Sequence, residues 1–459
     1  MGLDWQEIDR WVMGEAWTGS RIGAHLKVLC EDIGPRWSSS EAEKRAVGYI
    51  RDQMQADGAD RADLEAFQLE TWAWSRAEAG VVEDGRMIDI LPFNRCPSFR
   101  VEAPIVDVGY GTPREVEAVR DRLRGAAAVM ALGYEPFTTP IPHALRLQSL
   151  AEAGVAAAVV VEKKDGGRIE YHSASDWRDA DLNEHPLPTV TTSREGGALL
   201  RRLAAEGKRL RLAVESRFST APTANVACEV AGSRWPEAHL ILGGHHDTVY
   251  GSPGGNDNAS GTIAVMETAR ALARLRAETG IAPGMTVRFV TFSAEEQKFQ
   301  GASAYVARHY GPEAPPRLAI NLDELSAGHM KGIVLGFPHL RDLVQGQFDE
   351  MGDGLRCHVM SQIDASSDHF PFLRVGIDAA HLWRWRFHGR HADSDFHHEP
   401  GDTADKVNVR ELKEYVGQLA RLLLRLSHVP PEGWPENPVT VEQVRARLEG
   451  ERGTVVRVF

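Results

Sequence analysis

The sequence predicts an α/β fold in which a doubly wound, mostly parallel sheet carries a smaller inserted α/β unit. The chain has 459 residues, 42% of them hydrophobic, which is enough to bury the cores of two or three domains. From residue 225 onward, short apolar runs alternate with segments of helical periodicity, as in strands joined by crossover helices. Between residues 86 and 200 the apolar runs are short and separated by turns, which indicates a separate α/β unit.

The elements follow in order along the chain. Residues 21–59 have helical periodicity on both sides of a Gly-Pro break, with serines placed to cap the second half, so two helices are expected there. After residue 225, strands are expected at NVACEV, HLILGG, MTVRFVTF, RLAINLDE and AAHLW, and helices at ASGTIAVMETARAL, GASAYVARHY, HLRDLVQGQF and VRELKEYVGQLARLLLRL. The predicted main domain comprises residues 1–85 and 201–430, the inserted unit residues 86–200, and a C-terminal tail residues 431–459.

The composition argues against several classes of protein. The formal net charge of −13 disfavours nonspecific binding to nucleic acid. No apolar run approaches the roughly 20 residues that cross a bilayer, and the N-terminal segment lacks the features of a signal peptide. We therefore expect a cytoplasmic protein without membrane contact. Four cysteines lie far apart without a CxxC pair, which predicts buried thiols rather than disulfides: Cys30, Cys96, Cys228 and Cys357.

A glycine-rich loop follows the predicted strand HLILGG, at the sheet edge where open α/β folds bind ligands. His245 and Asp247 open this loop as an H-x-D pair, and Asp257 stands ten residues after the aspartate. An imidazole in such a pair can bind a metal ion while the nearby carboxylate fixes its tautomer. The alternative is that these side chains only satisfy turns and caps.

Two further predicted strands also end in carboxylates. Glu295 and Glu296 follow MTVRFVTF, and Asp323 and Glu324 follow RLAINL. Acidic side chains gathered at one sheet edge repel each other unless a cation neutralises them. In addition, six of the 18 histidines fall between residues 369 and 398, a density that favours a metal or a proton-transfer role for at least one of them.

Six stretches, in order, resemble a known family, the di-zinc aminopeptidase-type metallopeptidases related to aminopeptidase Y, glutamate carboxypeptidase and transferrin receptor. They are GGHHDTV, GGNDNASG, FSAEEQKFQGASAYV, NLDE, SSDHFPFLRVGI and HHEPGDTADKV. The resemblance covers most of the chain. It also implies that residues 86–200 are a protease-associated domain, inserted before the first metal ligand.

The resemblance implies two zinc ions per chain. It assigns His245, Asp257 and Asp323 to one ion, and Asp257, Glu296 and His398 to the other, so that Asp257 bridges the pair. These donors suit the chemistry, because zinc accepts imidazole nitrogen and carboxylate oxygen, and two close ions can share one activated water.

Several neighbours of these ligands receive supporting roles from the same resemblance. Glu295 is expected to be the catalytic general base. Asp247 and Asp402 are expected to orient the metal ligands without binding the metal themselves. For Asp368 and His369 two interpretations stay open, since these side chains either line the site or stabilise its loop.

The sequence departs from the family pattern at three positions. His397 precedes His398 where the family usually has an aromatic residue, and the spacing to PGDT favours His398 as the ligand. His246 follows the first ligand and is expected to pack or to face the substrate. Glu399 stands where a small hydroxyl residue is common, which leaves the local polarity in question.

The activity implied is a co-catalytic zinc hydrolase that cleaves an amide or peptide bond, and we expect an aminopeptidase acting on peptides. A carboxypeptidase, dipeptidase or specialised amidohydrolase is the alternative, if Arg384, Arg386 or Arg390 holds a substrate carboxylate. These arginines would otherwise pair with Asp393 and Asp395 in a surface loop. A non-catalytic binding protein fits less well, because the ligands and the general base are all present. A single-zinc cyclising transferase on this scaffold would hold one ion per chain.

Overall fold

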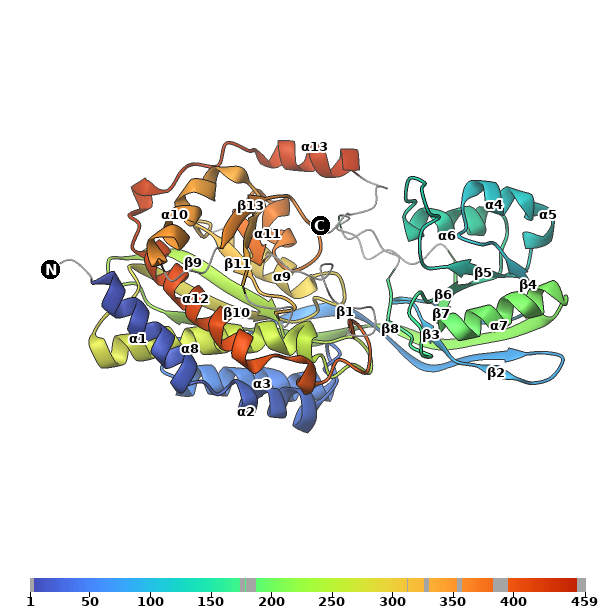
Figure 1. Cartoon of the computed structure of the whole chain (residues 1–459), viewed down its shortest axis with the longest axis horizontal. Helices are drawn as coiled ribbons and strands as arrows, with labels where there is room; N and C mark the ends of the chain where they lie inside the picture. The colour runs from blue at the N-terminus through green and yellow to red at the C-terminus, as the bar shows by residue number, and fades with distance from the viewer. Residues whose placement is uncertain are drawn as a thin grey trace.

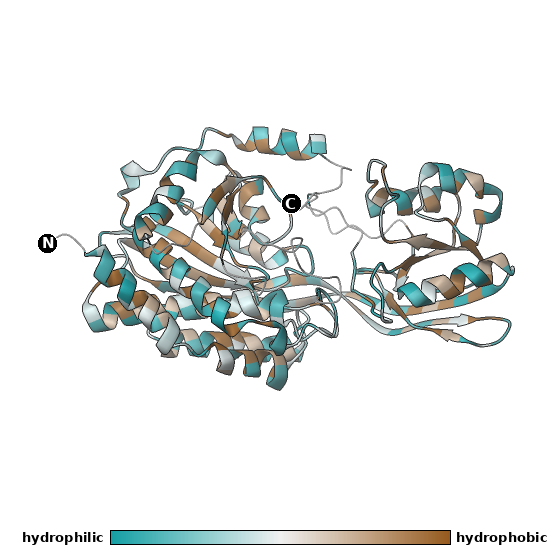
Figure 2. Ribbon diagram, viewed as in Figure 1, coloured by the Kyte–Doolittle hydropathy of each residue, from teal (hydrophilic) through white to brown (hydrophobic). Residues whose placement is uncertain are grey.

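A computed structural model shows two lobes joined by a pair of long strands (Figure 1). It describes residues 4–173, 178, 187–311, 313–325, 330–352, 357–382 and 395–451. Apolar side chains concentrate on the strands and on the helix surfaces that face them, whereas the outer helix surfaces are hydrophilic (Figure 2). Both lobes are therefore sheets covered by amphipathic helices.

The larger lobe is built on a mixed sheet with strand order β13-β12-β14-β11-β9-β10-β8. Neighbouring strands are parallel except at β12/β14 and β10/β8. The strands are β8 (Arg209–Val230), β9 (Trp235–His245), β10 (Met285–Phe292), β11 (Ala319–Asn321), β12 (Gly332–Leu335), β13 (His358–Ser361) and β14 (Ala379–Leu382).

Helices cover both faces of this sheet because its strands present apolar side chains to both faces. In β9, Leu240 and Leu242 belong to one hydrophobic cluster and Ile241 to another. The first cluster is completed by α1 (Trp5–Thr18), α2 (Ile22–Leu26), α3 (Glu41–Ala56), α8 (Gly261–Thr279), α10 (Arg341–Met351) and α12 (Val409–Ser427). The second is completed by α9 (Gln300–His309), α11 (Phe370–Arg374) and α13 (Val441–Glu451).

The smaller lobe repeats this design on a lesser scale (Figure 1). Strands β4 to β7 are parallel neighbours, β3 is an antiparallel edge strand, and β4 pairs with β8. The strands are β2 (Met87–Ile88), β3 (Ile90–Pro92), β4 (Phe99–Asp107), β5 (Ala127–Ala131), β6 (Ala157–Val161) and β7 (Thr189–Thr192). The helices are α4 (Pro113–Ala118), α5 (Arg120–Leu123), α6 (His143–Glu152) and α7 (Arg194–Ala205).

Strand β1 (Arg61–Val81) joins the lobes together with β8. The two strands are antiparallel, and their ladder runs from Arg61 opposite Glu229 to Val81 opposite Leu210, with one irregularity between Trp74 and Arg76. Short helical turns complete the chain: η1 (Lys27–Ile33), η2 (Gly255–Ser260), η3 (Pro338–Leu340), η5 (Ala404–Lys406) and η6 (Pro431–Gly433).

The predicted α/β fold with a mostly parallel sheet is confirmed. The predicted cap is also confirmed, since Ser40 accepts the Glu43 N–H at 3.1 Å at the start of α3. All four cysteines are free and buried, as expected. The domain boundaries at residues 85/86 and 200/201 stay a prediction.

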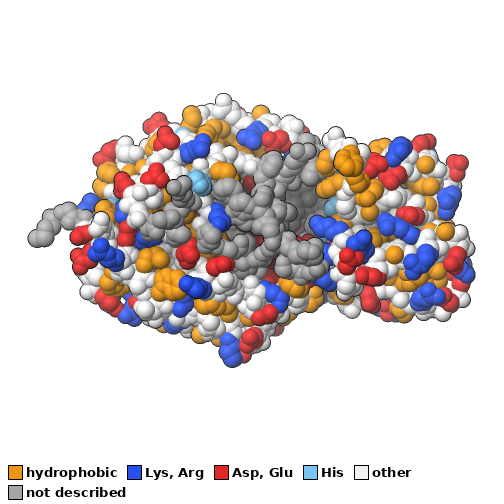
Figure 3. All heavy atoms as spheres, in the orientation of Figure 1, with side chains coloured by type: hydrophobic (Ala, Val, Ile, Leu, Met, Phe, Trp, Pro, Cys, Tyr) orange, Lys and Arg blue, Asp and Glu red, His pale blue; other side chains and the backbone are white. Residues whose placement is uncertain are grey.

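The elements that the sequence did not lead us to expect include α1, α11, α13, β1, β12 and β13. In the part of the chain described, no helix combines the length and apolar character needed to cross a membrane. On the face shown in Figure 3, acidic and basic side chains are interspersed over both lobes.

Candidate metal centre

Three neighbouring parallel strands deliver the predicted site residues to one edge of the larger sheet. In the order β11-β9-β10, His245 is the last residue of β9. Glu295 and Glu296 follow the end of β10, and Asp323 follows the end of β11. Carboxyl ends of parallel strands meet at the same edge, so side chains far apart in sequence become neighbours there.

The bridging candidate Asp257 lies in η2, between β9 and α8. Its loop is held by Asn258, whose side chain donates to the Leu322 carbonyl and accepts the Gly261 N–H, both at 2.8 Å. A Cβ at Gly261 would lie 2.3 Å from the same Leu322 carbonyl oxygen, so only glycine fits there. Asp402 accepts the Asp257 N–H at 2.9 Å and fixes the loop from the other side.

The first predicted ligand group is assembled around His245. Its Nε2 lies 3.1 Å from Asp257 Oδ1 and 3.4 Å from Asp323 Oδ1. Its Nδ1 faces the Asp247 carbonyl oxygen at 3.1 Å. A proton on Nδ1 satisfies this contact, and Nε2 is then the nitrogen that faces the carboxylates.

The second predicted group is assembled around His398. Its Nε2 lies 3.3 Å from Asp257 Oδ2 and 3.2 Å from Glu296 Oε2. Its Nδ1 donates to the Tyr171 carbonyl oxygen at 3.0 Å. Asp257 therefore directs one carboxylate oxygen toward each group, which is the arrangement of a bridging carboxylate.

The separations within both groups fit zinc. Two ligands of a tetrahedral zinc ion with bonds near 2.0–2.1 Å lie about 3.3 Å apart, and the four measured separations run from 3.1 to 3.4 Å. A charge-assisted hydrogen bond would bring the same atoms to about 2.7–2.9 Å. His245 Nε2 and Glu296 Oε1 are buried and make no hydrogen bond to any described residue. The donor set therefore fits two zinc ions.

The electrostatics of the cluster also indicate a cation site. Burial raises the pKa of Glu295 well above its usual range, and the carboxylates of Glu296 and Asp323 raise it further. Burial lowers the pKa of His398, but the carboxylates of Glu296 and Asp257 outweigh it and raise that pKa well above its usual range. Buried groups that shift one another in this way are typical of sites that bind a positive ion.

Asp247 lies behind the first group and connects it to Glu295. Its carboxylate accepts the Ser38 hydroxyl at 2.7 Å and the Glu295 N–H at 3.2 Å. The other carboxylate contact, from Oδ1 to His245 Nδ1, measures 3.4 Å. Asp247 thus holds both the imidazole and the main chain of the predicted general base.

The two additional histidines have different surroundings. His246 is buried, with Nδ1 3.0 Å from Thr291 Oγ1 and Nε2 3.5 Å from Glu43 Oε1, so it packs between β10 and α3. His397 Nδ1 lies 3.0 Å from Asp257 Oδ2 and 3.1 Å from Glu324 Oε1. His397 therefore faces the same oxygen of the bridging carboxylate as His398 does.

The loop before α11 contains Asp368 and His369. Burial raises the pKa of Asp368 well above its usual range, and the carboxylates of Asp247 and Asp323 contribute, so Asp368 belongs to the same acidic cluster. His369 instead faces Asp364 at 3.4 Å, and both are buried. Asp368 is therefore near enough to interact electrostatically with the cluster, whereas the carboxylate facing His369 is that of Asp364.

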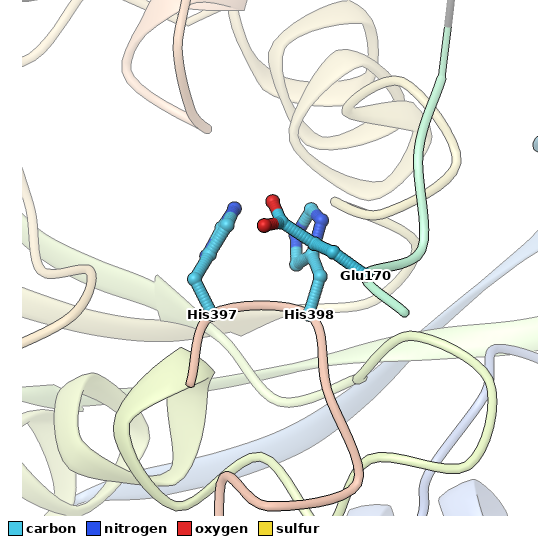
Figure 4. A group of neighbouring side chains, drawn as sticks. All are labelled: Glu170, His397 and His398. Carbon is cyan, nitrogen blue, oxygen red and sulfur yellow. The ribbon is translucent and has the colours of Figure 1, made fainter. Parts of the chain in front are cut away.

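The inserted segment, residues 86–200, contributes groups that the sequence did not single out. Glu170 projects from it toward the rings of His397 and His398 (Figure 4). Tyr171 contacts His398, which lies 227 positions away in the sequence, so no local sequence pattern predicts the contact. A further unpredicted residue is Arg36, which is fully buried beneath the loop that follows His245.

The proposed carboxylate-binding arginines Arg384, Arg386 and Arg390 lie outside the described residues, as does Asp393. Asp395 is described, and its side chain accepts the His397 N–H at 3.1 Å. The predicted pairing between these arginines and aspartates stays a prediction.

Comparison with known proteins agrees with this geometry. Carboxypeptidase Q of Xenopus laevis is 25% identical over 311 residues, which cover 66% of this chain and 64% of that protein. A probable leucine aminopeptidase 2 of Aspergillus fumigatus is 26% identical over 327 residues, which cover 69% of this chain and 62% of that protein. The chain thus spans less than two thirds of either relative's length.

The fold is also shared with a solved structure. BSAP, a zinc aminopeptidase from Bacillus subtilis, superposes with a TM-score of 0.70 at 20% identity, covering 88% of this chain and 94% of that one. Residues 225–423, which contain the ligand candidates from the end of β9 to His398, match the peptidase family M28.

Proposed function

We propose that the chain is an exopeptidase with two zinc ions that removes residues from the amino end of peptides. The division of the Asp257 oxygens between His245 and His398 carries this proposal, because a carboxylate that presents one oxygen to each ligand group is suited to bridge two metal ions. The family match supports a peptidase, and the relatives named leucine aminopeptidase and zinc aminopeptidase support cleavage at the amino end.

Zinc ions held by the predicted ligands would supply a Lewis acid and would make a water molecule at the site easier to deprotonate; these ligands are His245, Asp257, Glu296, Asp323 and His398. Glu295 is the residue placed to move protons, because its Oε2 lies 4.0 Å from His245 Nε2 and outside the bridging arrangement. It takes a proton from the attacking water and passes it to the leaving amine. Asp247 keeps Glu295 and His245 in a fixed mutual position during this transfer.

A carboxypeptidase is the second candidate, since carboxypeptidase Q is among the relatives. The two activities differ in which end of the substrate must be free. Leucine p-nitroanilide, its N-acetyl derivative and an N-blocked dipeptide therefore separate them. We expect hydrolysis of the first compound alone, by protein that contains two zinc ions in elemental analysis. Cleavage of the blocked dipeptide, or protein that binds no zinc, would contradict the proposal.

We also propose that the protein works in the cytoplasm on peptides or small amides. Four free, buried cysteines support a reducing compartment, because secreted proteins usually oxidise paired thiols. Fractionation of cells, followed by assay of each fraction with leucine p-nitroanilide, tests the location.

A further inference from the structure

Residues 162–172 of the inserted segment lie against the loop that contains His398 (Figure 4). The two segments exchange a pair of hydrogen bonds at one point. The Tyr171 N–H donates to the His398 carbonyl oxygen at 3.0 Å, and the His398 Nδ1–H donates to the Tyr171 carbonyl oxygen at 3.0 Å. The second bond fixes the tautomer and directs Nε2 toward Asp257 and Glu296.

The neighbouring residue Glu399 anchors the same loop through charge. Its buried carboxylate receives two parallel bonds from Arg168, at 2.7 and 2.8 Å, and one from Lys164 at 2.7 Å. Lys164 also pairs with Glu170 at 2.9 Å and lies 3.8 Å from Asp395, so two cations connect three carboxylates. Both cations come from the inserted segment. A bidentate arginine pair in a buried setting fixes orientation as well as position.

The backbone of His398 explains why such anchoring is needed. Its φ of 54° lies in the left-handed region, which is unfavourable for a residue with a Cβ. A conformation of this kind persists when surrounding contacts hold it. Here the contacts on both sides of the residue, Tyr171 and the pairs on Glu399, come from the inserted segment.

We infer that the inserted segment is a positioning element for the metal centre: through Tyr171, Lys164 and Arg168 it holds His398 in place and so retains the ion bound by Asp257, Glu296 and His398. The inference rests on the two zinc ions of the proposed function. It also accounts for Glu399, the acidic residue that departs from the family pattern, because in the described part of the chain both cations that pair with its carboxylate come from the inserted segment.

The test follows the release of zinc from the fully loaded protein to an excess of a chromogenic chelator. Two ions leave the wild type, each with its own rate. In Glu399→Gln, which keeps the shape but loses the charge, we expect one ion to leave at least 10-fold faster, since loss of groups that orient a ligand commonly weakens metal binding by about 10–100-fold. The other ion, on His245 and Asp323, is expected to leave at the wild-type rate.

Arg168→Met provides a second variant that leaves Glu399 partly paired through Lys164, and Arg168→Lys is expected to restore part of the retention. The matched control is Arg194→Met, which removes an exposed ion pair with Asp165 within the same inserted segment. Circular dichroism verifies that each variant is folded. In a His398→Ala background, Glu399→Gln should no longer change release of the remaining ion.

Wild-type release rates for both ions in folded Glu399→Gln and Arg168→Met would overturn the inference while leaving the proposed function intact. Faster release of both ions together would also overturn it, because that outcome indicates a general loosening. A wild type that binds no zinc would instead refute the proposed function.

Discussion

Among the individual residues, the adjacent carboxylates Glu295 and Glu296 have different tasks in the proposed mechanism. Glu296 Oε2 faces His398, within the second ligand group. The Glu295 main chain is held by Asp247, and its side chain approaches His245 only at 4.0 Å. One side chain is therefore placed to bind an ion and the other to move a proton.

We expect Glu295→Gln to lower kcat by at least 100-fold and to keep both zinc ions. An amide has nearly the shape of a carboxylate but cannot accept the proton, and general bases commonly contribute about 10²–10⁴-fold. Assay with leucine p-nitroanilide and elemental analysis of the same sample give the result. Glu296→Gln is the matched variant and should lose one zinc. The reverse pattern would show that the two roles are exchanged.

The two adjacent histidines give a second prediction. His398 faces two carboxylates through Nε2, whereas His397 contacts Asp257 and Glu324. We expect His398→Ala to lose one zinc per chain and nearly all activity. His397→Ala should keep both ions and alter mainly KM. A zinc deficit in His397→Ala with normal content in His398→Ala would show that His397 is the ligand.

The five ligand candidates could be named from sequence because each stands in a short stretch with specific residue types and spacing. Tyr171 could not, since it acts through a main-chain carbonyl that every residue has. Lys164 and Arg168 occur in KKDGGR, which has the composition of an ordinary charged turn. Their partner Glu399 is more than 200 positions away, so only the folded chain brings the charges together.

At the level of elements, the loop from β9 to α8 depends on one buried cation. The Arg36 side chain is fully buried and makes several hydrogen bonds to main-chain oxygens. Its acceptors, at 2.7 to 3.0 Å, are the carbonyl oxygens of Leu29, Gly34, His246 and Pro253. Arg36 thereby ties the segment before α3 to the loop that positions Asp257.

Arg36→Met should lower the free energy of unfolding by about 3–5 kcal/mol, because it leaves several buried carbonyl groups without donors. Urea unfolding measured by circular dichroism gives this value. Arg51→Met, which removes an exposed pair with Asp52, is the control and should change it by less than about 0.5 kcal/mol. A loss below about 1 kcal/mol for Arg36→Met would mean that water replaces the guanidinium.

The predictability of an element depended on its pattern. Strands β9 and β10 are buried on both faces and appear in the sequence as continuous apolar runs, so they were predicted. Strand β1 was missed because its sequence, RADLEAFQLETWAWSRAEAGV, mixes charged and small residues, and it is exposed along much of its length. Strands β12 and β13 have four residues each, too few to show a period.

For the whole molecule, the C-terminal segment is joined to the larger lobe near a carboxylate with an unusual titration. Burial raises the pKa of Asp378 to about 7. Its side chain lies 3.3 Å from His339 and accepts a bond of 3.4 Å from Asn437. In the unfolded chain this carboxyl ionises near pH 4, about three units lower.

The folded state therefore holds a proton on Asp378 that the unfolded state has lost between about pH 4 and pH 7, so this group makes stability fall as pH rises through that window. In Asp378→Asn, the free energy of unfolding should depend less on pH. At pH 8 it should exceed that of the wild type by up to about 4 kcal/mol. Thermal unfolding from pH 4 to pH 8 measures this change in stability, and Asp349→Asn on the exposed side of α10 is the control. Parallel curves for Asp378→Asn and the wild type would contradict the assignment.

Strands β1 and β8 can also be viewed as a single hairpin, with everything between Val81 and Arg209 in the place of its turn. Hairpin tips accept insertions readily, because the pairing below does not depend on what closes the loop. This suggests an evolutionary route in which a hairpin of the larger lobe lengthened and acquired a folded unit at its end. Shortening the hairpin at paired positions, such as Trp72 and Phe218, would retrace that step and leave a closed ladder. A cut at residues 86 and 200 would instead remove β4 and leave the edge of β8 from Arg209 to Val214 without its partner, which invites aggregation.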